Sequence, residues 1–181
     1  MALFEHGSSS SRHRPRSKAV ATTLEQAGRV AMLMDLVTRD KDAVAAQHRF
    51  DVVLLGQRLV VAIDWLGDHP DTAAMPLGLF GASSGAAATL VVAAERPVRV
   101  QSVVARGGRP DLAGEALTQA QVPVLLIVGR DDTEVLRLHR VHLMPGVTHL
   151  FEEPGALADV AKVAGGWFLR PGGEEVEEWW R

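Results

Sequence analysis

The sequence predicts an α/β fold in which a mostly parallel sheet lies between two layers of helices. Short apolar runs of strand length alternate along the chain with longer segments whose apolar residues recur at helical spacing. Strands that alternate with helices typically build a parallel sheet covered on both faces. The run 122–128 is also apolar throughout apart from Pro123, which is typical of a strand buried on both faces.

Six apolar runs are the predicted strands, and residues that favour turns or carry charge end several of them. The first run ends at His6-Gly7, the second at Asp35, and the fourth leads into the Gly-rich loop 106–111. The predicted strands cover residues 2–4, 30–34, 77–80, 98–104, 122–128 and 141–144.

The longer segments between the strands predict helices. The segment that begins near Arg49 has one apolar face, and Gly67 and Pro70 end it. Gly28 ends the helix that begins at Ser17. The predicted helices cover residues 17–27, 49–66, 84–95 and 154–169, with a short helix or turn over 112–120 and a loop over 38–47.

Composition excludes several classes of protein. The 181 residues are 47% hydrophobic and carry a net charge of −3, so we expect one soluble domain with no nucleic-acid partner. No apolar run reaches the roughly 18 residues of a membrane span, so no membrane partner is expected. The chain has no cysteine, which excludes disulfides, thiolate zinc sites and cysteine nucleophiles. Residues 1–7 lack the features of a signal peptide, so we expect a cytoplasmic location.

We expect the domain to span residues 1–170. The remaining residues, 171–181, form an acidic tail that contains Trp179 and Trp180. A tryptophan pair of this kind is either disordered or docked on apolar surface.

The pentapeptide Gly81-Ala82-Ser83-Ser84-Gly85 is the most informative motif. It has the pattern Gly-x-Ser-x-Gly and lies between a predicted strand and a predicted helix, which is the arrangement of a nucleophile elbow. Glycines at both flanks allow close backbone approach, and the helix that follows directs free N–H groups at the place where an oxyanion would form. We therefore predict that Ser83 is a nucleophile.

A serine nucleophile requires a base, and the base requires an acid that orients it. His149 follows the last predicted strand, and Asp132 follows the strand 122–128. The order Ser83, Asp132, His149 is the order of an α/β-hydrolase triad, and all three lie past the carboxyl ends of strands. Asp131 competes for the role of the acid, but the spacing Gly-x-x-Asp favours Asp132.

Two further groups of residues flank this predicted site. A backbone N–H near Ser8 and the N–H of Ser84 are candidate oxyanion donors, although the segment that includes Ser8 can equally be a simple polar turn. Arg106 and Arg109 can bind a substrate carboxylate through the planar guanidinium. They can equally tie the Gly-rich loop to the sheet through carbonyl groups or Asp111.

The chain resembles the serine branch of the dienelactone hydrolase-like α/β-hydrolases, including the hydrolase domains fused to phosphoribosyltransferases. The resemblance covers about residues 2–168 and implies a triad of Ser83, Asp132 and His149 with no cofactor. Dienelactone hydrolase itself uses a cysteine nucleophile, so its substrate is not carried over. The resemblance rests on the stretches 6–13, 81–87, 106–113 and 148–155.

Two departures from the family pattern carry expectations of their own. The family has further strands before the one that ends at His6, so we expect a three-layer α/β-hydrolase sandwich that lacks the usual first strands. Their absence leaves an open sheet edge, through which we expect two copies to pair as a homodimer. Only eight residues, 133–140, separate Asp132 from Val141. Because parallel strands need a crossover of about a dozen residues, we expect the last strand to pair differently or the sheet to expose a face, with modest activity as the result.

Two other chemistries are disfavoured. The run Asp131-Asp132-Thr133 is similar to a phosphoribosyltransferase diphosphate loop, but Gly129-Arg130 intervenes after the strand and no Thr-Gly follows. His139 and His142 are three residues apart, a spacing that in an extended strand points side chains to opposite faces, which disfavours a metal site. Two function classes remain: a serine hydrolase acting on a small acyl substrate, and a non-catalytic or degenerate α/β module that binds a partner.

Overall fold

Six strands form one all-parallel sheet in the order β2-β1-β3-β4-β5-β6 in the computed structural model. The structure describes residues 1–6, 12–13, 15–37, 50–129, 131–132, 142–144, 151 and 153–168. The strands are β1 (Ala2–His6), β2 (Ala31–Asp35), β3 (Leu77–Ala82), β4 (Val100–Arg106), β5 (Val124–Gly129) and β6 (His142–Met144). The predicted parallel sheet is thereby confirmed.

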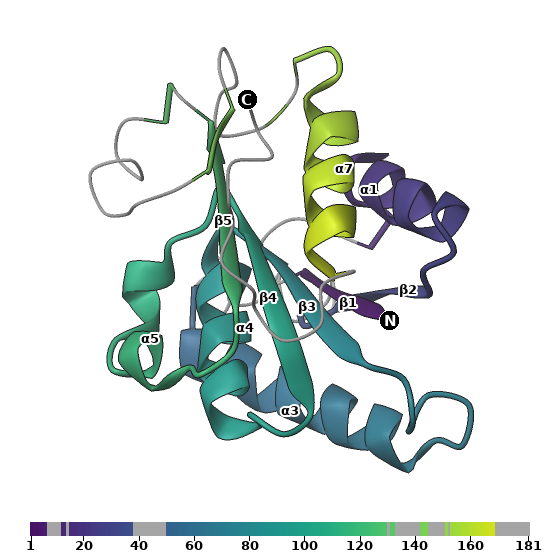
Figure 1. Ribbon diagram of the computed structural model, residues 1–181. Helices are drawn as coiled ribbons and strands as arrows, with labels where there is room; N and C mark the ends of the chain where they lie inside the picture. The colour runs from purple at the N-terminus through teal and green to yellow at the C-terminus, as the bar shows by residue number, and fades with distance from the viewer. Residues whose placement is uncertain are drawn as a thin grey trace.

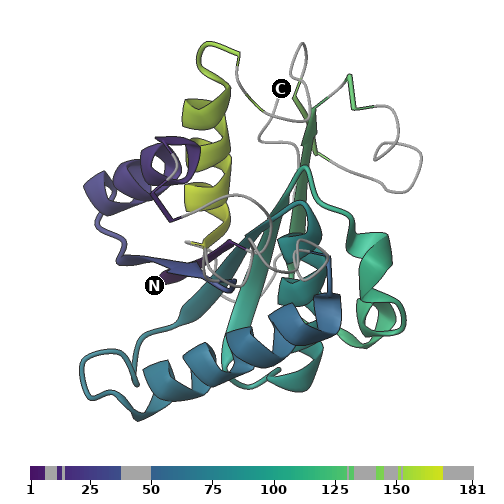
Figure 2. The same cartoon turned by 180° about the vertical axis from the view of Figure 1, so that it is seen from behind.

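Helices cover both faces of the sheet, which gives three layers (Figure 1 and Figure 2). One face carries α1 (Pro15–Gln26) and α7 (Ala156–Phe168), and these two helices pack against each other. The opposite face carries α3 (Val52–Asp68) and α4 (Ser84–Glu95). Two short helices, η2 (Pro110–Ala113) and α5 (Ala116–Gln119), follow β4 and lie near α4.

Alternation along each strand divides the buried side chains into two cores. On β1, β3 and β4 the residues Phe4, Phe80 and Val104 face α1 and α7, whereas their neighbours Leu3, Leu79 and Val103 face α3 and α4. Each of these six side chains is at most 4% exposed. A strand with both faces covered has no polar side, which explains why the sequence shows continuous apolar runs.

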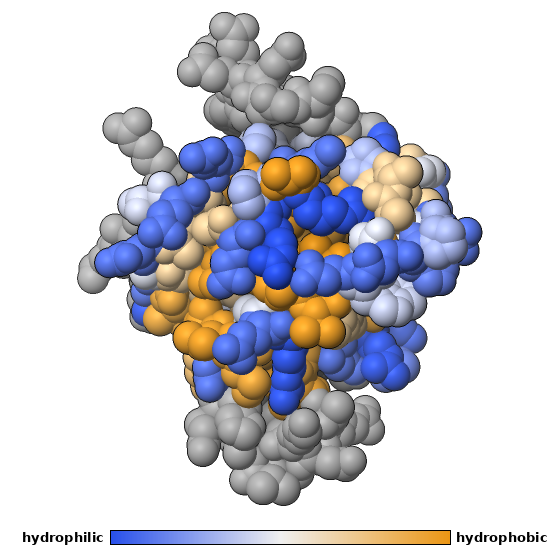
Figure 3. All heavy atoms as spheres, turned by 90° about the horizontal axis from the view of Figure 1, so that it is seen from below, coloured by the Kyte–Doolittle hydropathy of each residue, from blue (hydrophilic) through white to orange (hydrophobic). Residues whose placement is uncertain are grey.

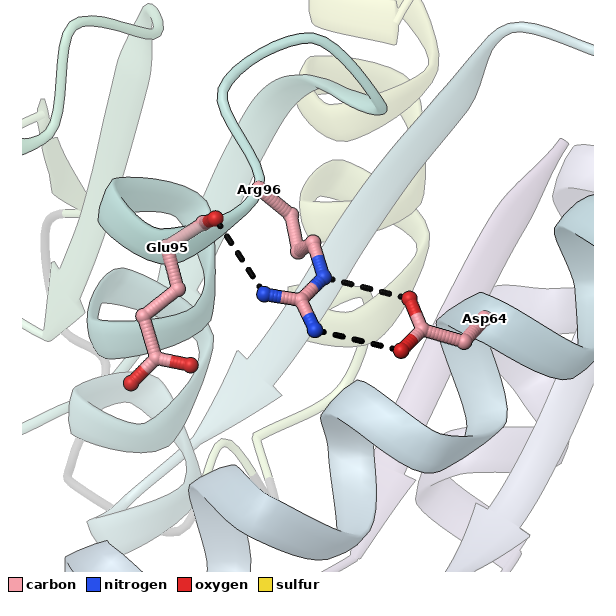
Figure 4. Close-up of polar contacts among 3 residues, drawn as sticks. All are labelled: Asp64, Glu95 and Arg96. Carbon is pink, nitrogen blue, oxygen red and sulfur yellow. Dashed lines mark hydrogen bonds and ion pairs between the residues drawn. The ribbon is translucent and has the colours of Figure 1, made fainter.

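Helix α3 forms where the sequence predicts an apolar face. Asp51 caps its first turn by accepting a hydrogen bond from the Leu54 N–H at 3.0 Å, and Leu55, Leu59 and Ile63 are fully buried. At its other end, the Arg96 guanidinium makes two 3.1 Å contacts with the Asp64 carboxylate, which joins α3 to the end of α4 (Figure 4). This hydrogen-bonded pair holds the pKa of Asp64 below its ordinary value.

Apolar side chains also reach the surface on the outer side of α3. Val53, Val61 and Trp65 are each more than half exposed. The ring centres of Trp65 and His69 lie 4.9 Å apart, with the two planes tilted by 38°. The view from below shows apolar surface interleaved with polar residues (Figure 3).

The expectation that the last strand would pair differently is wrong. β6 runs parallel to β5, with Ile127 opposite His142 and Gly129 opposite Met144. The connection begins after Gly129 and not after Asp132, so residues 130–141 provide 12 residues, which meets the minimum of about a dozen for a parallel crossover.

The remaining predicted elements are confirmed, with ends that differ by three residues at most. The segment 112–120 divides into η2 and α5. The predicted loop 38–47 and the predicted tail 171–181 lie outside the described residues.

Candidate active site

Ser83 occupies the turn between β3 and α4, as the motif predicts. Its backbone has φ 56° and ψ −127°, a region that residues with a side chain rarely adopt. Among the described residues only Ser83 and Phe151 combine a side chain with positive φ. Strain of this kind costs about 1–3 kcal/mol and is concentrated at functional sites.

The two flanking glycines are required by two different contacts. A Cβ on Gly81 would stand 2.8 Å from the Ala86 Cα, so the first turn of α4 closes directly over the end of β3. A Cβ on Gly85 would stand 1.5 Å from the Glu5 Oε1. The lack of a side chain at Gly81 therefore leaves room for the backbone of α4, and the lack of one at Gly85 leaves room for the side chain of Glu5.

The hydroxyl of Ser83 is not used to cap α4. Ser83 is the N-cap residue, but its side chain makes no capping hydrogen bond, and the residue is half-buried. Ser84 is buried and begins α4, so its N–H belongs to the first turn of the helix, which lacks intrahelical acceptors. The elbow thus places a hydroxyl and a helix N-terminus together, as an acyl-transfer site requires.

The Gly-rich loop after β4 is tied to the elbow. The Arg109 N–H donates to the Ser83 carbonyl at 3.4 Å, and the Gly107 N–H donates to the Ile127 carbonyl at 2.7 Å. A Cβ on Gly108 would stand 2.3 Å from the Ala86 Cβ. The loop therefore braces the turn that holds Ser83, a role that the glycine pair in the sequence did not reveal.

Gly108→Ala is expected to destabilise the protein by about 1–3 kcal/mol, because the new methyl group overlaps a methyl group of α4. Urea unfolding measures the change. Adding Ala86→Gly removes the opposing methyl group, so the double variant should recover more stability than the two single changes predict by addition. Strict additivity of the two changes would contradict this contact.

The candidate acid lies two strands from the nucleophile. Ser83 follows β3 and Asp132 follows β5, with β4 between them, and two strands separated by a third lie about 10 Å apart. An imidazole fits between side chains at that separation. The Asp132 N–H donates to the Gly129 carbonyl at 3.0 Å, and Asp132 is half-buried whereas Asp131 is exposed. The difference in burial favours Asp132 over Asp131 as the acid.

Two predicted site residues, Ser8 and His149, lie outside the described residues. The described strands that precede them in the chain end at the same edge of the sheet. β1 ends at His6, beside the end of β3, and β6 ends at Met144, beside the end of β5.

Arg109 and Arg106 have different surroundings. Arg109 forms a two-pronged ion pair with Asp111, at 2.8 and 2.7 Å, which is the loop-tethering alternative from the sequence. The Arg106 guanidinium lies 6.0 Å from the Phe80 ring centre and 5.4 Å from that of Phe151. Burial lowers the pKa of Arg106 to about 10, with a smaller effect from Arg16, so it is a cation at neutral pH. Substrate binding by either arginine stays a prediction.

Glu5 is a site residue that sequence reasoning missed. It lies on β1 next to the elbow and is 3% exposed, and its Oε1 accepts a long hydrogen bond of 3.4 Å from the Ala82 N–H. Burial raises the pKa of Glu5 to about 8. The available signal was an ionisable residue directly after the apolar run 2–4, in a strand whose two faces are both covered.

Solved structures with the same fold are numerous, and several of them are hydrolases. Est1E from Butyrivibrio proteoclasticus matches over 93% of this chain and 86% of its own, with a TM-score of 0.70 and 13% identity. A serine hydrolase without a lid from Xanthomonas campestris matches over 94% and 83%, with a TM-score of 0.66 and 19% identity. At these identities the likeness establishes the fold, and the fold is that of an α/β hydrolase.

A closer relative defines the family. The dienelactone hydrolase from Anabaena variabilis is 48% identical, with a TM-score of 0.88 over 93% of this chain and 84% of its own. This chain belongs to the dienelactone hydrolase family of α/β hydrolases. No protein-family model matches it.

Two curated relatives from Mycobacterium tuberculosis strains carry a different name. They are provisionally named phosphoribosyl transferases and are 47% identical over 180 residues, which is 93% of this chain. The chain spans about 40% of their length. None of the helices among the described residues is long and apolar enough to cross a membrane.

Proposed function

We propose that this chain is a serine hydrolase that cleaves an ester or related acyl compound through an acyl-enzyme intermediate. The observation that carries the proposal is the positive φ of Ser83 at the N-terminus of α4. Strained geometry there turns the serine out of the helix and leaves its hydroxyl uncommitted to capping. The family relationship to a hydrolase supports the same class of chemistry.

In the proposed mechanism the Ser83 Oγ attacks the acyl carbon while His149 takes the hydroxyl proton. The tetrahedral oxyanion is held by the Ser84 N–H and by a backbone N–H near Ser8. The bond to the leaving alcohol then breaks, and His149 returns the proton to that alcohol. Water repeats the sequence on the acyl-enzyme and releases the acid, with Asp132 orienting the imidazole throughout.

A fluorophosphonate probe tests the proposal in one experiment. The probe should label the wild-type chain once, and mass spectrometry of the digested protein should place the adduct on Ser83. Ser83→Ala should abolish labelling, whereas Ser102→Ala, a half-buried serine of β4, should be labelled at the wild-type rate. A folded wild-type chain that takes no label would favour the non-catalytic module.

Asp132→Asn is expected to lower kcat about 10⁴-fold, because the amide favours the wrong imidazole tautomer. Asp131→Asn, which makes the same chemical change at the exposed neighbour, should keep kcat within about threefold, as an exposed charge is worth little. Steady-state hydrolysis of 4-nitrophenyl acetate measures both. The reverse ranking would assign the acid to Asp131.

The longer relatives are named as phosphoribosyl transferases, but we do not assign that activity to this chain. The matched portion is about 40% of each relative, and this portion has the hydrolase fold. We infer that a phosphoribosyl transfer activity, where present, belongs to the other 60%. A small-molecule acyl substrate, a homodimer, the cytoplasmic location and the domain limits 1–170 remain predictions.

A further inference from the structure

Glu5 is a buried carboxyl group that the proposed mechanism does not use. It belongs to the end of β1, and its side chain projects under the first turn of α4. The Gly85 Cα lies so close that a methyl group there would stand 1.5 Å from Oε1 and 2.4 Å from Oε2. Gly85 therefore provides the space that Glu5 fills.

The contacts of the carboxyl group are uneven. Oε1 accepts the hydrogen bond from the Ala82 N–H, the residue that precedes Ser83. Oε2 is buried and has no hydrogen-bond partner among the described residues. A buried oxygen without a partner is costly, so a carboxyl group at this position needs a reason beyond packing.

Within the part of the chain that the structure describes, the groups that face Glu5 are nearly all uncharged. β3 and the first two turns of α4 contribute no charged residue. On β2, Asp35 is paired with Arg12 at 3.1 Å, and on α3 the Arg58 guanidinium donates to the Leu36 carbonyl. Burial is accordingly the main cause of the raised pKa of Glu5, with the Ala82 hydrogen bond opposing it.

We propose that Glu5 is a positioning residue of the nucleophile elbow. Its side chain ties the end of β1 to the Ala82 backbone and packs against the first turn of α4. Through these contacts it fixes the position of the Ser83 hydroxyl relative to the Ser84 N–H. This inference rests on the proposed function for its catalytic consequence, and on the fold alone for its structural one.

If Glu5 has this role, the protonation state of its carboxyl group should make the activity depend on pH. The neutral acid fits its apolar surroundings, whereas the carboxylate places negative charge beside the N–H groups that must stabilise an oxyanion. Activity should therefore fall above about pH 8 as Glu5 ionises. One pH unit above that pKa about a tenth of the acid remains, so kcat should fall about tenfold between pH 7 and pH 9.

The first arm of the test compares kcat and KM for 4-nitrophenyl acetate in Glu5→Ala, Glu5→Gln and the control Glu95→Gln, an exposed acid at the other end of α4. Glu5→Ala should lose kcat about 100-fold, the cost of a misplacement near 1 Å, with KM little changed. Glu5→Gln keeps the shape and the acceptor, so it should restore kcat at pH 7 and abolish the alkaline fall. Glu95→Gln should match the wild type.

The second arm does not depend on activity. Amide hydrogen exchange should become at least about tenfold faster at Ala82 and at Ala86, whose N–H donates to the Ser83 carbonyl, in Glu5→Ala than at the control amides of Val104 and Leu125, and Glu5→Gln should reverse this. Equal acceleration at all four amides would overturn the inference, as would an alkaline fall that persists in Glu5→Gln. If Ser83 takes no fluorophosphonate in any variant, the proposed function fails while the exchange result still decides the role of Glu5.

Discussion

Ser83→Ala is expected to lower kcat for 4-nitrophenyl acetate by about 10⁶-fold, and His149→Ala by a similar factor. The two residues act on one proton transfer, so the double variant should be no slower than either single variant. Steady-state rates, corrected for uncatalysed hydrolysis, measure all three.

His69→Ala is the matched control for the histidine change. His69 follows α3 and contacts the Trp65 ring, so its removal should leave kcat within about twofold, as changes away from a site have small effects. A near-normal rate for His149→Ala together with a dead Ser83→Ala would show that another residue is the base. Multiplicative losses in the double variant would show that the two residues act independently.

Glu5→Gln is expected to stabilise the protein increasingly as pH rises. The pKa of Glu5 is 4.5 in an ordinary setting and about 8 in the folded chain, so between these values the folded state keeps a proton that the unfolded state has lost. The sign follows from linkage: the free energy of unfolding decreases as pH rises. The slope is about 1.4 kcal/mol per pH unit, which amounts to roughly 5 kcal/mol over the 3.5 units between the two pKa values.

Urea unfolding at pH 5, 6.5 and 8 checks this expectation. The difference between Glu5→Gln and the wild type isolates the single carboxyl group, because every other titrating group is common to both proteins. Glu95→Gln should follow the wild type at each pH. Parallel curves for Glu5→Gln and the wild type would show that Glu5 is already ionised when folded.

Local patterns in the sequence were sufficient to place the helices and strands. Periodicity and breakers located α3 and α4, because helical spacing and glycine act over a few neighbouring residues. The pairing of β6 was not predictable in the same way. The pairing depended on where β5 ends. When the connection to β6 is counted from Asp132 it is too short for a parallel crossover, whereas β5 ends at Gly129 and leaves a longer connection.

Residues of the candidate site also differ in whether neighbouring or distant parts of the sequence determine their position. The position of Ser83 at a turn was predictable from the sequence because strand, turn and helix N-terminus are adjacent in the chain. Glu5 was missed because its burial depends on Gly85, a residue 80 positions away. Arg109 remained open between two alternatives because Asp111 and a substrate carboxylate attract a guanidinium equally well.

The backbone strain at Ser83 bears on how such a chain changes over generations. Glycine adopts positive φ without the penalty of a side chain, so Ser83→Gly would relieve about 1–3 kcal/mol. A protein with this fold that no longer needed activity would gain stability from Ser83→Gly, so this substitution should be favoured there. A serine kept at this position is thus a standing cost in stability, of the kind that proteins retain where activity depends on a strained residue.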